Sequence, residues 1–375
     1  MEEINRMPFK NIFLGKKVLI TGNTGFKGSW LTVWLLKLGA DIIGISKDIP
    51  TNPSMFEDLD LSQKIKFYQN DVTDKDKVTE IILNEKPDFI FHLAAQAIVS
   101  VSYKSPFETM STNIMGTASI LESLKDYENE CTVIMITSDK CYDNVEWPWG
   151  YKETDKLGGK DIYSGSKGAA ELVINSYVES FFKDNDKIKI GVGRAGNVIG
   201  GGDWAKDRIV VDCVKSWSKN KAVEIRSPSA TRPWQHVLEP LSGYLTLAEN
   251  IFNKKNKQGN AYNFGPKSEQ NRTVLNLLED LSIFWNFNDP KESYNITDNI
   301  PFFESDLLKL NCDKALLDLK WESNLNYQET VKFVGSWYKE YYKNNTNLYS
   351  FTENQIKEYE DIAMERDRVW LNETS

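Results

Sequence analysis

The sequence is poor in the residues that bind metals and form disulfides. Its 375 residues include only two histidines, His92 and His236, and four cysteines that stand far apart without a C-x-x-C pair. No cluster with metal-ligand spacing can be drawn from them. Scattered free thiols are typical of a reducing compartment. The sequence therefore predicts a cytoplasmic protein without a metal centre.

Three further absences narrow the class of protein. No apolar run approaches the roughly 18 residues that a membrane span needs, and the N-terminal segment MEEINRMPFKNIFLGKK lacks the apolar core of a signal peptide. No basic domain stands out in a chain of net charge −9 and pI near 5.1. Membrane insertion and broad nucleic-acid binding are therefore not expected.

The chain does contain a regular alternation of strands and helices. Before residue 130, four segments with strand character are separated by helical patterns, at 17–21, 41–46, 64–72 and 87–96. A fifth apolar run follows at 132–136. This alternation predicts an α/β fold with a doubly wound parallel (Rossmann) sheet.

The later part of the chain predicts a smaller, α-rich lobe that binds substrate. Thr352 and Gln355 could form a capping box for a last helix, which is expected to end near Trp370. The expected division is 1–190 for the dinucleotide-binding domain with a return segment at 233–265, 191–232 and 266–350 for the lobe, and 351–375 for the C-terminal helix.

A glycine-rich turn follows the first expected strand. Gly22, Gly25 and Gly28 form G-x-x-G-x-x-G between that strand and an apolar helical run. Glycines permit a tight turn and let the backbone approach a pyrophosphate at a helix N-terminus. An ordinary strand-to-helix turn is the alternative, but the order of strand, glycines and helix favours dinucleotide binding.

The ends of the next strands bear on the choice of dinucleotide. Asp48 comes two residues late for the acidic residue that holds the ribose of NAD, and Lys47 could accept a 2′-phosphate. This strand therefore leaves NAD and NADP open. Asp71 could meet the adenine amino group, and the small Ala94 and Ala95 would let a cofactor lie close.

Tyr163 and Lys167 are the strongest candidates for chemistry. They stand at i and i+4, which places both side chains on one face of a helix, and no other Tyr in the chain has this partner. A lysine beside a phenol favours the phenolate, so the pKa of Tyr163 is expected to fall. A phenolate can take a proton from a sugar hydroxyl while hydride leaves the same carbon. A core tyrosine and a surface lysine are the alternative.

Several segments carry a family resemblance: TGNTGFKGSW, HLAAQ, TSDKCYDN, WPWGYKETD, YSGSK, RAGNVIGGGDWAKDR and TRPWQHVLEPLSGYL. Over roughly residues 17–340 the chain resembles the extended short-chain dehydrogenase/reductase family, and within it the nucleotide-sugar 4,6-dehydratases that act on CDP-glucose. Asn23 stands where this group often has His. Ala97-Ile98-Val99-Ser100 replaces the usual Pro-Leu-Val-Arg.

The resemblance implies a reaction without net redox change. Tyr163 takes the C4 hydroxyl proton, Lys167 lowers the pKa of Tyr163 and holds the nicotinamide ribose, and Ser138 hydrogen-bonds the C4 oxygen. Water then leaves across C5–C6, with Asp139 as the acid at C6 and Lys140 as the base at C5, before hydride returns to C6. A structural ion pair is the alternative for Lys140.

The resemblance also implies partners and binding residues. NAD and a nucleotide sugar are the expected ligands, and a homodimer or homotetramer is expected to form through helices around 106–126 and 163–182. The expected cofactor contacts are Gly22, Thr24, Gly25, Phe26, Gly28, Ser46, Asp71, Val72, Leu93, Ala94, Ala95, Tyr163 and Lys167. The expected substrate contacts are Gln96, Asn197, Gly202, Trp204, Arg208, Arg232 and His236.

Some of these residues have structural alternatives. Gly200–Gly202 is expected to be a mobile loop that faces a ligand, and Trp204 to stack on the base or sugar. His236 could contact substrate or be packed, and Arg194 could be structural. A nucleotide-sugar 4-epimerase, a dehydratase for another nucleotide sugar, or a non-catalytic dinucleotide-binding regulator are the alternative functions. The regulator is disfavoured because the Tyr163/Lys167 pair is intact.

Overall fold

The centre of the molecule is a seven-stranded sheet in the order β11-β6-β5-β4-β1-β2-β3. The computed structural model describes residues 8–253, 258–267, 270–285, 287–297, 307–343 and 347–371. The strands of the sheet are β1 (Lys17–Thr21), β2 (Asp41–Ser46), β3 (Lys66–Gln69), β4 (Phe89–His92), β5 (Cys131–Ile136), β6 (Ile188–Ala195) and β11 (Ala261–Phe264). All neighbouring strands are parallel, which confirms the predicted doubly wound fold.

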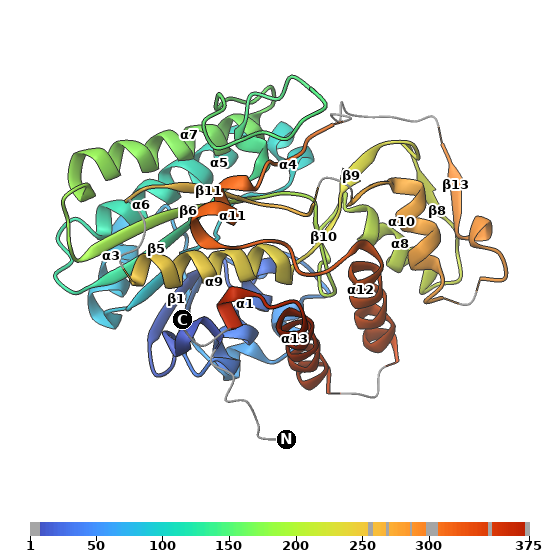
Figure 1. Cartoon of the computed structure of the whole chain (residues 1–375), viewed down its shortest axis with the longest axis horizontal. Helices are drawn as coiled ribbons and strands as arrows, with labels where there is room; N and C mark the ends of the chain where they lie inside the picture. The colour runs from blue at the N-terminus through green and yellow to red at the C-terminus, as the bar shows by residue number, and fades with distance from the viewer. Residues whose placement is uncertain are drawn as a thin grey trace.

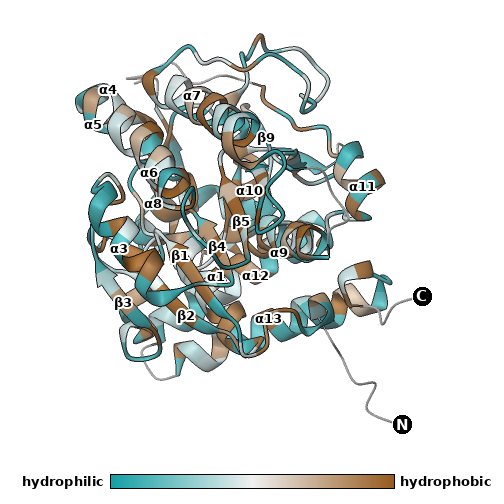
Figure 2. Cartoon of the chain, turned by 90° about the vertical axis from the view of Figure 1, so that its left-hand side faces the viewer, coloured by the Kyte–Doolittle hydropathy of each residue, from teal (hydrophilic) through white to brown (hydrophobic). Residues whose placement is uncertain are grey.

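Helices cover both faces of this sheet (Figure 1). Because side chains alternate along a strand, Val18 and Ile20 of β1 belong to one apolar cluster and Leu19 to the other. The first cluster includes α1 (Phe26–Lys37) and α9 (Leu238–Phe252), and the second includes α3 (Lys75–Glu85), α6 (Gly116–Ser123) and α7 (Ile162–Tyr177). The strands β1, β4 and β5 are accordingly mostly brown in Figure 2.

The two helical stretches expected at a subunit interface are each interrupted by a wider turn. The first consists of α5 (Pro106–Met110), a π-helical turn (Ser111–Met115) and α6. In the second, α7 is followed by another π-helical turn (Val178–Phe182). Such π turns are often found at functional sites. The first of them contains Asn113, which takes part in the candidate site described below.

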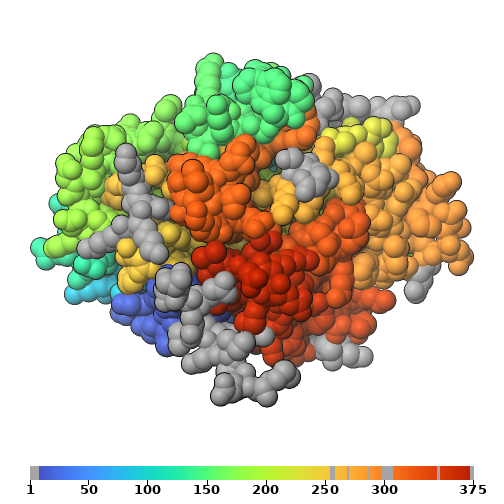
Figure 3. Space-filling view, in the orientation of Figure 1, coloured from blue at the N-terminus to red at the C-terminus, as the bar shows by residue number. Residues whose placement is uncertain are grey.

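Among the remaining elements, α8, α10, β8, β9 and β13 lie apart from the sheet, at the right of Figure 1. The other helices are α2 (Met55–Asp58), α4 (Val99–Lys104), α8 (Ile209–Trp217), α10 (Val274–Ser282), α11 (Asp313–Leu319), α12 (Tyr327–Tyr342) and α13 (Leu348–Glu365). The short strands are β7 (Val198–Ile199), β8 (Val223–Ile225), β9 (Thr231–Pro233), β10 (Gln235–His236), β12 (Asn271–Thr273) and β13 (Tyr294–Ile296). The C-terminal helices, red in Figure 3, cover much of the face shown there.

Two predicted boundaries were wrong. The division between residues 190 and 191 falls inside β6, which continues to Ala195 because both β5 and β11 pair with it. The last helix begins at Leu348, since the Asn347 side chain caps it by accepting a hydrogen bond from Ser350 N at 3.2 Å. Thr352 and Gln355 are buried inside that helix and form no capping box. Among the described residues, no helix has the length and apolar character needed to cross a membrane.

Candidate active site

Ser138 and Asp139 lie at the carboxyl end of β5, where ligands bind in open parallel sheets. Both side chains are buried, and Ser138 Oγ donates a hydrogen bond to Asp139 Oδ1 at 2.9 Å. The carboxylate lies against Gly196 at the end of β6. A Cβ at that position would come 1.7 Å from Asp139 Oδ2, so only glycine leaves room for the acid.

Tyr163 and Lys167 are presented to the same place by α7. The helix is capped by Asp161, which accepts a hydrogen bond from Ser164 N at 2.9 Å. Tyr163 and Lys167 are both buried, and Ser138 and Asp139 lie close enough to the phenol to affect its pKa. The structure therefore brings Tyr163, Ser138 and Asp139 together at one place, as a proton-handling site requires.

The expected fall in the pKa of Tyr163 does not occur in the free protein. Burial raises the pKa of Tyr163 to about 12, against the smaller, opposite effect of the neighbouring Ser138 hydroxyl. Burial likewise lowers the pKa of Lys167 to about 8, although Glu171 opposes this shift. Removing both groups from water disfavours their charged forms, and this outweighs the pairing that the i, i+4 spacing suggested.

A buried ion pair holds α7 against the sheet next to this site. Arg194 of β6 donates to both oxygens of Glu171, with Nε–Oε1 at 2.8 Å and Nη2–Oε2 at 2.9 Å. Thr137, directly after β5, donates to Glu171 Oε1 at 2.5 Å. Glu171 lies one helical turn after Lys167. Arg194 is therefore structural, which was one of its two expected roles.

Asn113 is a functional candidate that the sequence did not reveal. Its Nδ2 donates to Ser166 Oγ at 2.8 Å, and its Oδ1 accepts from Gln96 N at 2.8 Å. Asn113 thus connects α7 to the loop after β4. In the sequence it is one polar residue in a helical pattern, so no local signal distinguishes it. The predicted substrate residue Gln96 lies in this network, with its side-chain amide bonded to Ile98 O and Thr109 Oγ1.

The glycine turn is built to admit a group close to the backbone. Gly22 has φ +73°, and a Cβ there would come 2.8 Å from Ala94 N. A Cβ at Gly28 would come 2.1 Å from Gly22 O. Ser46 holds the turn from β2, since its Oγ donates to Asn23 Oδ1 at 2.8 Å and accepts from Thr24 N at 3.3 Å. The turn, Ser46 and the segment after β4 therefore form one cradle in which Gly22 and Gly28 cannot bear side chains.

Lys47 is paired with two carboxylates at the rim of this cradle. Its Nζ lies 3.2 Å from Asp71 Oδ2 and 3.2 Å from Glu108 Oε1. Hydrogen bonding to Asp71, and then to Glu108, raises the pKa of Lys47. The lysine that could have accepted a 2′-phosphate is therefore already neutralised by acidic partners.

Three of the predicted substrate contacts, Trp204, Gly202 and His236, are buried against other parts of the protein. Trp204 is 2% exposed and packs against Tyr338 and Tyr341, so no face of its indole is open to a ligand. The segment Gly200–Gly202 is a buried turn, not an open loop. A Cβ at Gly201 would meet the Trp337 ring at 2.1 Å, and one at Gly202 would meet Met55 Sδ at 2.5 Å.

His236 is the third of these residues. Its ring is fully buried between Trp30 and Phe333, and burial lowers its pKa to about 3. The packed role, one of the two expected for His236, is the one that these contacts support. His92 is also in the core, as expected from its apolar run, and its Nδ1 lies 2.8 Å from Thr21 Oγ1.

The other substrate candidates differ in their relation to the site. Arg208 is exposed but lies close enough to Tyr163 to affect its pKa. Asn197 has φ +53° beside Gly196, at the carboxyl edge of the sheet. Arg232 lies on β9, opposite Arg272 of β12.

Lys140 follows Asp139 directly, and within the described ranges its ammonium has no ion pair. The alternative that Lys140 forms a structural ion pair therefore gains no support.

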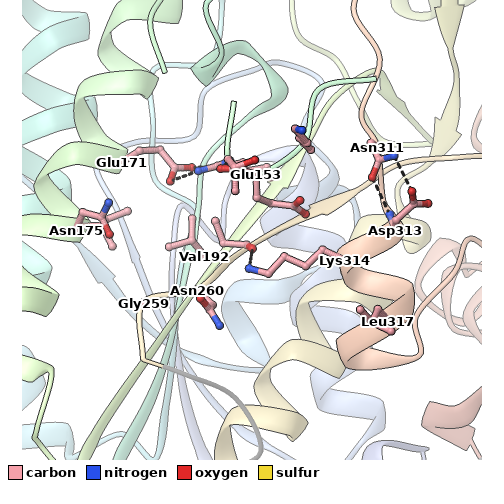
Figure 4. Close-up of a pocket in the computed structure, with 15 residues that line it drawn as sticks. Glu153, Glu171, Asn175, Val192, Gly259, Asn260, Asn311, Asp313, Lys314 and Leu317 are labelled. Atoms are coloured by element: carbon pink, nitrogen blue, oxygen red, sulfur yellow. Dashed lines mark hydrogen bonds and ion pairs between the residues drawn. The ribbon is translucent and has the colours of Figure 1, made fainter. Parts of the chain in front are cut away.

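A cavity of about 610 Å³ is lined in part by Glu171 and Arg194 (Figure 4). Glu153, Asn311 and Lys314 contribute to its polar wall, and Lys314 Nζ donates to Ala261 O at 2.8 Å. None of the predicted catalytic, cofactor or substrate residues lines it. In the part of the chain that the structure describes, no group of three His, Cys, Asp or Glu side chains could hold a metal ion.

The fold and this site define a dinucleotide-binding enzyme of the sugar-nucleotide type, and comparison with known proteins agrees. Residues 19–334 match the GDP-mannose 4,6 dehydratase family, and the chain belongs to that family. The resemblance to extended short-chain dehydrogenase/reductases is thereby confirmed.

Individual relatives narrow the comparison further. The chain is 45% identical to the CDP-glucose 4,6-dehydratase of Salmonella typhimurium over 334 residues, which cover 88% of this chain and 92% of the relative. It is 27% identical to the CDP-paratose 2-epimerase of Salmonella typhi, over 86% of this chain and 98% of that one. The NAD complex of dTDP-glucose 4,6-dehydratase from Bacillus anthracis superimposes with a TM-score of 0.73 at 18% identity, over 89% of this chain and 100% of that one.

Proposed function

We propose that this protein is a nucleotide-sugar 4,6-dehydratase that converts CDP-glucose to CDP-4-keto-6-deoxyglucose, with NAD as a recycled cofactor. The 45% identity to a CDP-glucose 4,6-dehydratase over 92% of that relative carries the proposal. The site supports it, because a buried carboxyl group adjoins the Tyr163–Ser138 pair. A 4-epimerase needs the tyrosine and serine but has no leaving hydroxyl for Asp139 to protonate.

The oxidation step uses the residues gathered at the end of β5. Tyr163 takes the proton of the C4 hydroxyl, and Ser138 holds the C4 oxygen. The Lys167 ammonium, one turn from Tyr163 on α7, stabilises the phenolate. When bound in the glycine cradle, NAD supplies the acceptor for the C4 hydride and a positive charge beside the phenol. Such a charge favours the phenolate that burial alone disfavours.

The elimination step uses the two residues that follow Ser138. A ketone at C4 acidifies the C5 proton. Lys140 is the candidate base in its neutral amine form, because no ion pair with a carboxylate holds it protonated among the described residues. Asp139 protonates the departing C6 hydroxyl. The tight seat of its carboxyl group against Gly196 keeps that acid in one position. Burial of the site excludes bulk water from the intermediate.

The rim of the cradle supports NAD over NADP. A 2′-phosphate near Lys47 would also meet Asp71 and Glu108, the two carboxylates that bind this lysine. Without further cations nearby, these two carboxylates would repel the doubly negative 2′-phosphate. The proposed cofactor contacts therefore include Gly22, Gly25, Gly28, Thr24, Phe26, Ser46, Asp71, Val72, Leu93, Ala94, Ala95, Tyr163 and Lys167.

We also propose that two copies pair through the helices α5, α6 and α7. These helices pack on one another, and their outer side carries large exposed apolar side chains. Phe107 is 86% exposed, and Met115, Leu172 and Phe181 are each more than half exposed. Exposed apolar groups gathered on neighbouring helices mark association surfaces. The four cysteines are free thiols, which suits the proposed cytoplasmic location.

The proposed division into domains changes at the 190/191 boundary, because β6 continues across it. The dinucleotide-binding part comprises the seven-stranded sheet with its helices, including the return segment that supplies α9 and β11. The substrate lobe comprises the elements from α8 to β9 and from β12 onward. Gln96, Asn197, Arg208 and Arg232 stay the proposed substrate contacts.

Incubation with CDP-glucose and NAD tests the reaction directly. The expected product has lost one water and shows the alkaline absorbance of a 4-keto sugar, with no net NADH at completion. A product of unchanged mass with an inverted C4 centre would identify an epimerase instead. Parallel assays with UDP-, dTDP- and GDP-sugars separate an error in the nucleotide from an error in the reaction.

A further inference from the structure

Gln235 is a buried amide in the segment TRPWQHV, and the proposed mechanism gives it no role. It is 1% exposed and lies on β10, which pairs in parallel with β7 so that Gln235 is in register with Val198. Its backbone N donates to Asn197 O at 3.2 Å. β10 therefore lies beside the residues that follow β6, at the carboxyl edge of the sheet.

The side-chain amide of Gln235 joins the ends of two strands of the sheet. Its Nε2 donates to Gly196 O at 2.8 Å and to Phe264 O at 3.0 Å. Gly196 directly follows β6, and Phe264 is the last residue of β11, which pairs with β6. One amide nitrogen thus uses both of its N–H groups to bind carbonyl oxygens at neighbouring strand ends.

The Gly196 peptide that Gln235 holds is the wall behind the Asp139 carboxyl group. A Cβ on Gly196 would lie 2.0 Å from Asp139 Cγ and 1.7 Å from Oδ2, so the carboxyl group lies directly against this backbone. The next residue, Asn197, has φ +53°, in the left-handed region. Glycine restrains its own backbone least, and the left-handed conformation of Asn197 is unfavourable by itself. The hydrogen bonds from Gln235 therefore keep this segment in place.

We propose that Gln235 is a positioning residue for Asp139. By holding the Gly196 carbonyl, it fixes the surface against which the carboxyl group lies, and so the direction in which that group gives its proton. The inference rests on the proposed function, in which Asp139 protonates the C6 hydroxyl that leaves as water. In the part of the chain that the structure describes, no hydrogen bond links Gln235 to Tyr163 or Ser138. Loss of the amide should therefore slow elimination and leave oxidation intact.

A matched pair of variants tests this role. Gln235→Met keeps the length of the side chain and removes both donors. Gln355→Met makes the same change in α13, where Nε2 of a buried amide donates to Phe333 O at 2.9 Å and to Ser336 Oγ at 3.0 Å. Both changes remove two buried hydrogen bonds, so similar losses of thermal stability are expected. Of the two amides, only that of Gln235 is bonded to the peptide beside Asp139.

A single turnover of CDP-glucose with bound NAD separates the two steps. In Gln235→Met we expect NADH to form as in wild type and to disappear about ten- to a hundredfold more slowly, because a small misplacement of a catalytic group has an effect of this size. Gln355→Met should match wild type in both phases. Decay of NADH at the wild-type rate in Gln235→Met, or an equal slowing in Gln355→Met, would overturn the proposal.

The Asp139→Asn background tests whether Gln235 acts through Asp139. Once the acid is absent, its position no longer matters, so Gln235→Met should slow the decay of NADH no further. The same fold-slowing in Asp139→Asn as in wild type would show that Gln235 acts by another route.

Crystal structures of the two variants provide a readout that does not depend on the reaction. The Gly196 carbonyl and the Asp139 carboxyl group should be displaced in Gln235→Met and unchanged in Gln355→Met. An undisplaced carboxyl group in Gln235→Met would overturn the proposal. A wild type that forms no 4-keto product from any nucleotide sugar would instead refute the proposed function, and these structures would then decide the role of Gln235 alone.

Discussion

In the proposed mechanism, Asp139 is the residue that distinguishes a dehydratase from an epimerase. Asp139→Asn keeps the size of the side chain but cannot supply an acidic proton to the leaving hydroxyl. Oxidation at C4 depends on Tyr163, Ser138 and Lys167, which stay intact. We expect NADH to accumulate on the enzyme while the 4-keto-6-deoxy product forms about 10² to 10⁴ times more slowly. Reduced-nicotinamide absorbance during a single turnover measures this.

Tyr163→Phe provides the matched control for that experiment. Without the phenol no group takes the C4 proton, so neither NADH nor product should appear. Turnover of Asp139→Asn at the wild-type rate would show that Asp139 is not the acid, and the dehydratase mechanism would lose its main support.

At the scale of elements, the close approach of the ends of β5 and β6 fixes the position of the Asp139 carboxyl group. Gly196→Ala would place a Cβ 1.7 Å from Asp139 Oδ2, so the carboxyl group must move. We expect a hundredfold or greater loss of product formation, by analogy with the general-acid contribution, with NAD binding unchanged. Gly165→Ala in α7 is the control, because its Cβ would meet only Met110 Cε at 3.9 Å. Equal activity of both variants would contradict the proposed role of Gly196 in positioning the Asp139 carboxyl group.

The Glu171–Arg194 pair connects α7 to the sheet at the same scale. Glu171→Gln leaves the buried Arg194 guanidinium without its carboxylate, which should lower the free energy of unfolding by about 3–5 kcal/mol. Glu179→Gln is the control, since its pair with Lys183 at 2.8 Å is exposed and should contribute less than about 1 kcal/mol. Urea unfolding at neutral pH compares the two. Similar midpoints for both variants would show that the buried pair does not anchor the helix.

At the scale of the whole molecule, association is predicted through α5, α6 and α7. Phe107→Arg places a charge on the most exposed apolar residue of this surface and should shift the protein towards the monomer. Ile283→Arg is the control, because Ile283 is 74% exposed but follows α10 in the other lobe. Light scattering at micromolar concentration measures both. A monomeric wild type, or a Phe107→Arg variant that stays associated, would reject this interface.

Much of the fold was predictable because its signals are local. The strands at 17–21 and 41–46 occur at the predicted residues, since a parallel strand buried on both faces is a continuous apolar run. The glycine turn was equally clear, because Gly22 and Gly28 stand where any side chain would collide with backbone. The placement of Tyr163 and Lys167 on one helix face followed from their spacing, and the placement of Ser138 and Asp139 followed from the rule that ligands bind at the carboxyl edge.

The remaining features depend on contacts between distant segments. Trp204 and His236 lie in motifs that suggest ligand contacts, but aromatic residues of α12 and Trp30 of α1 bury them. The pKa of Tyr163 is set by removal from water, which no spacing records. Local pattern thus determined the elements and the catalytic pair, while burial and long-range packing decided which neighbouring polar groups are free to act, because solvent exclusion is a property of the assembled chain.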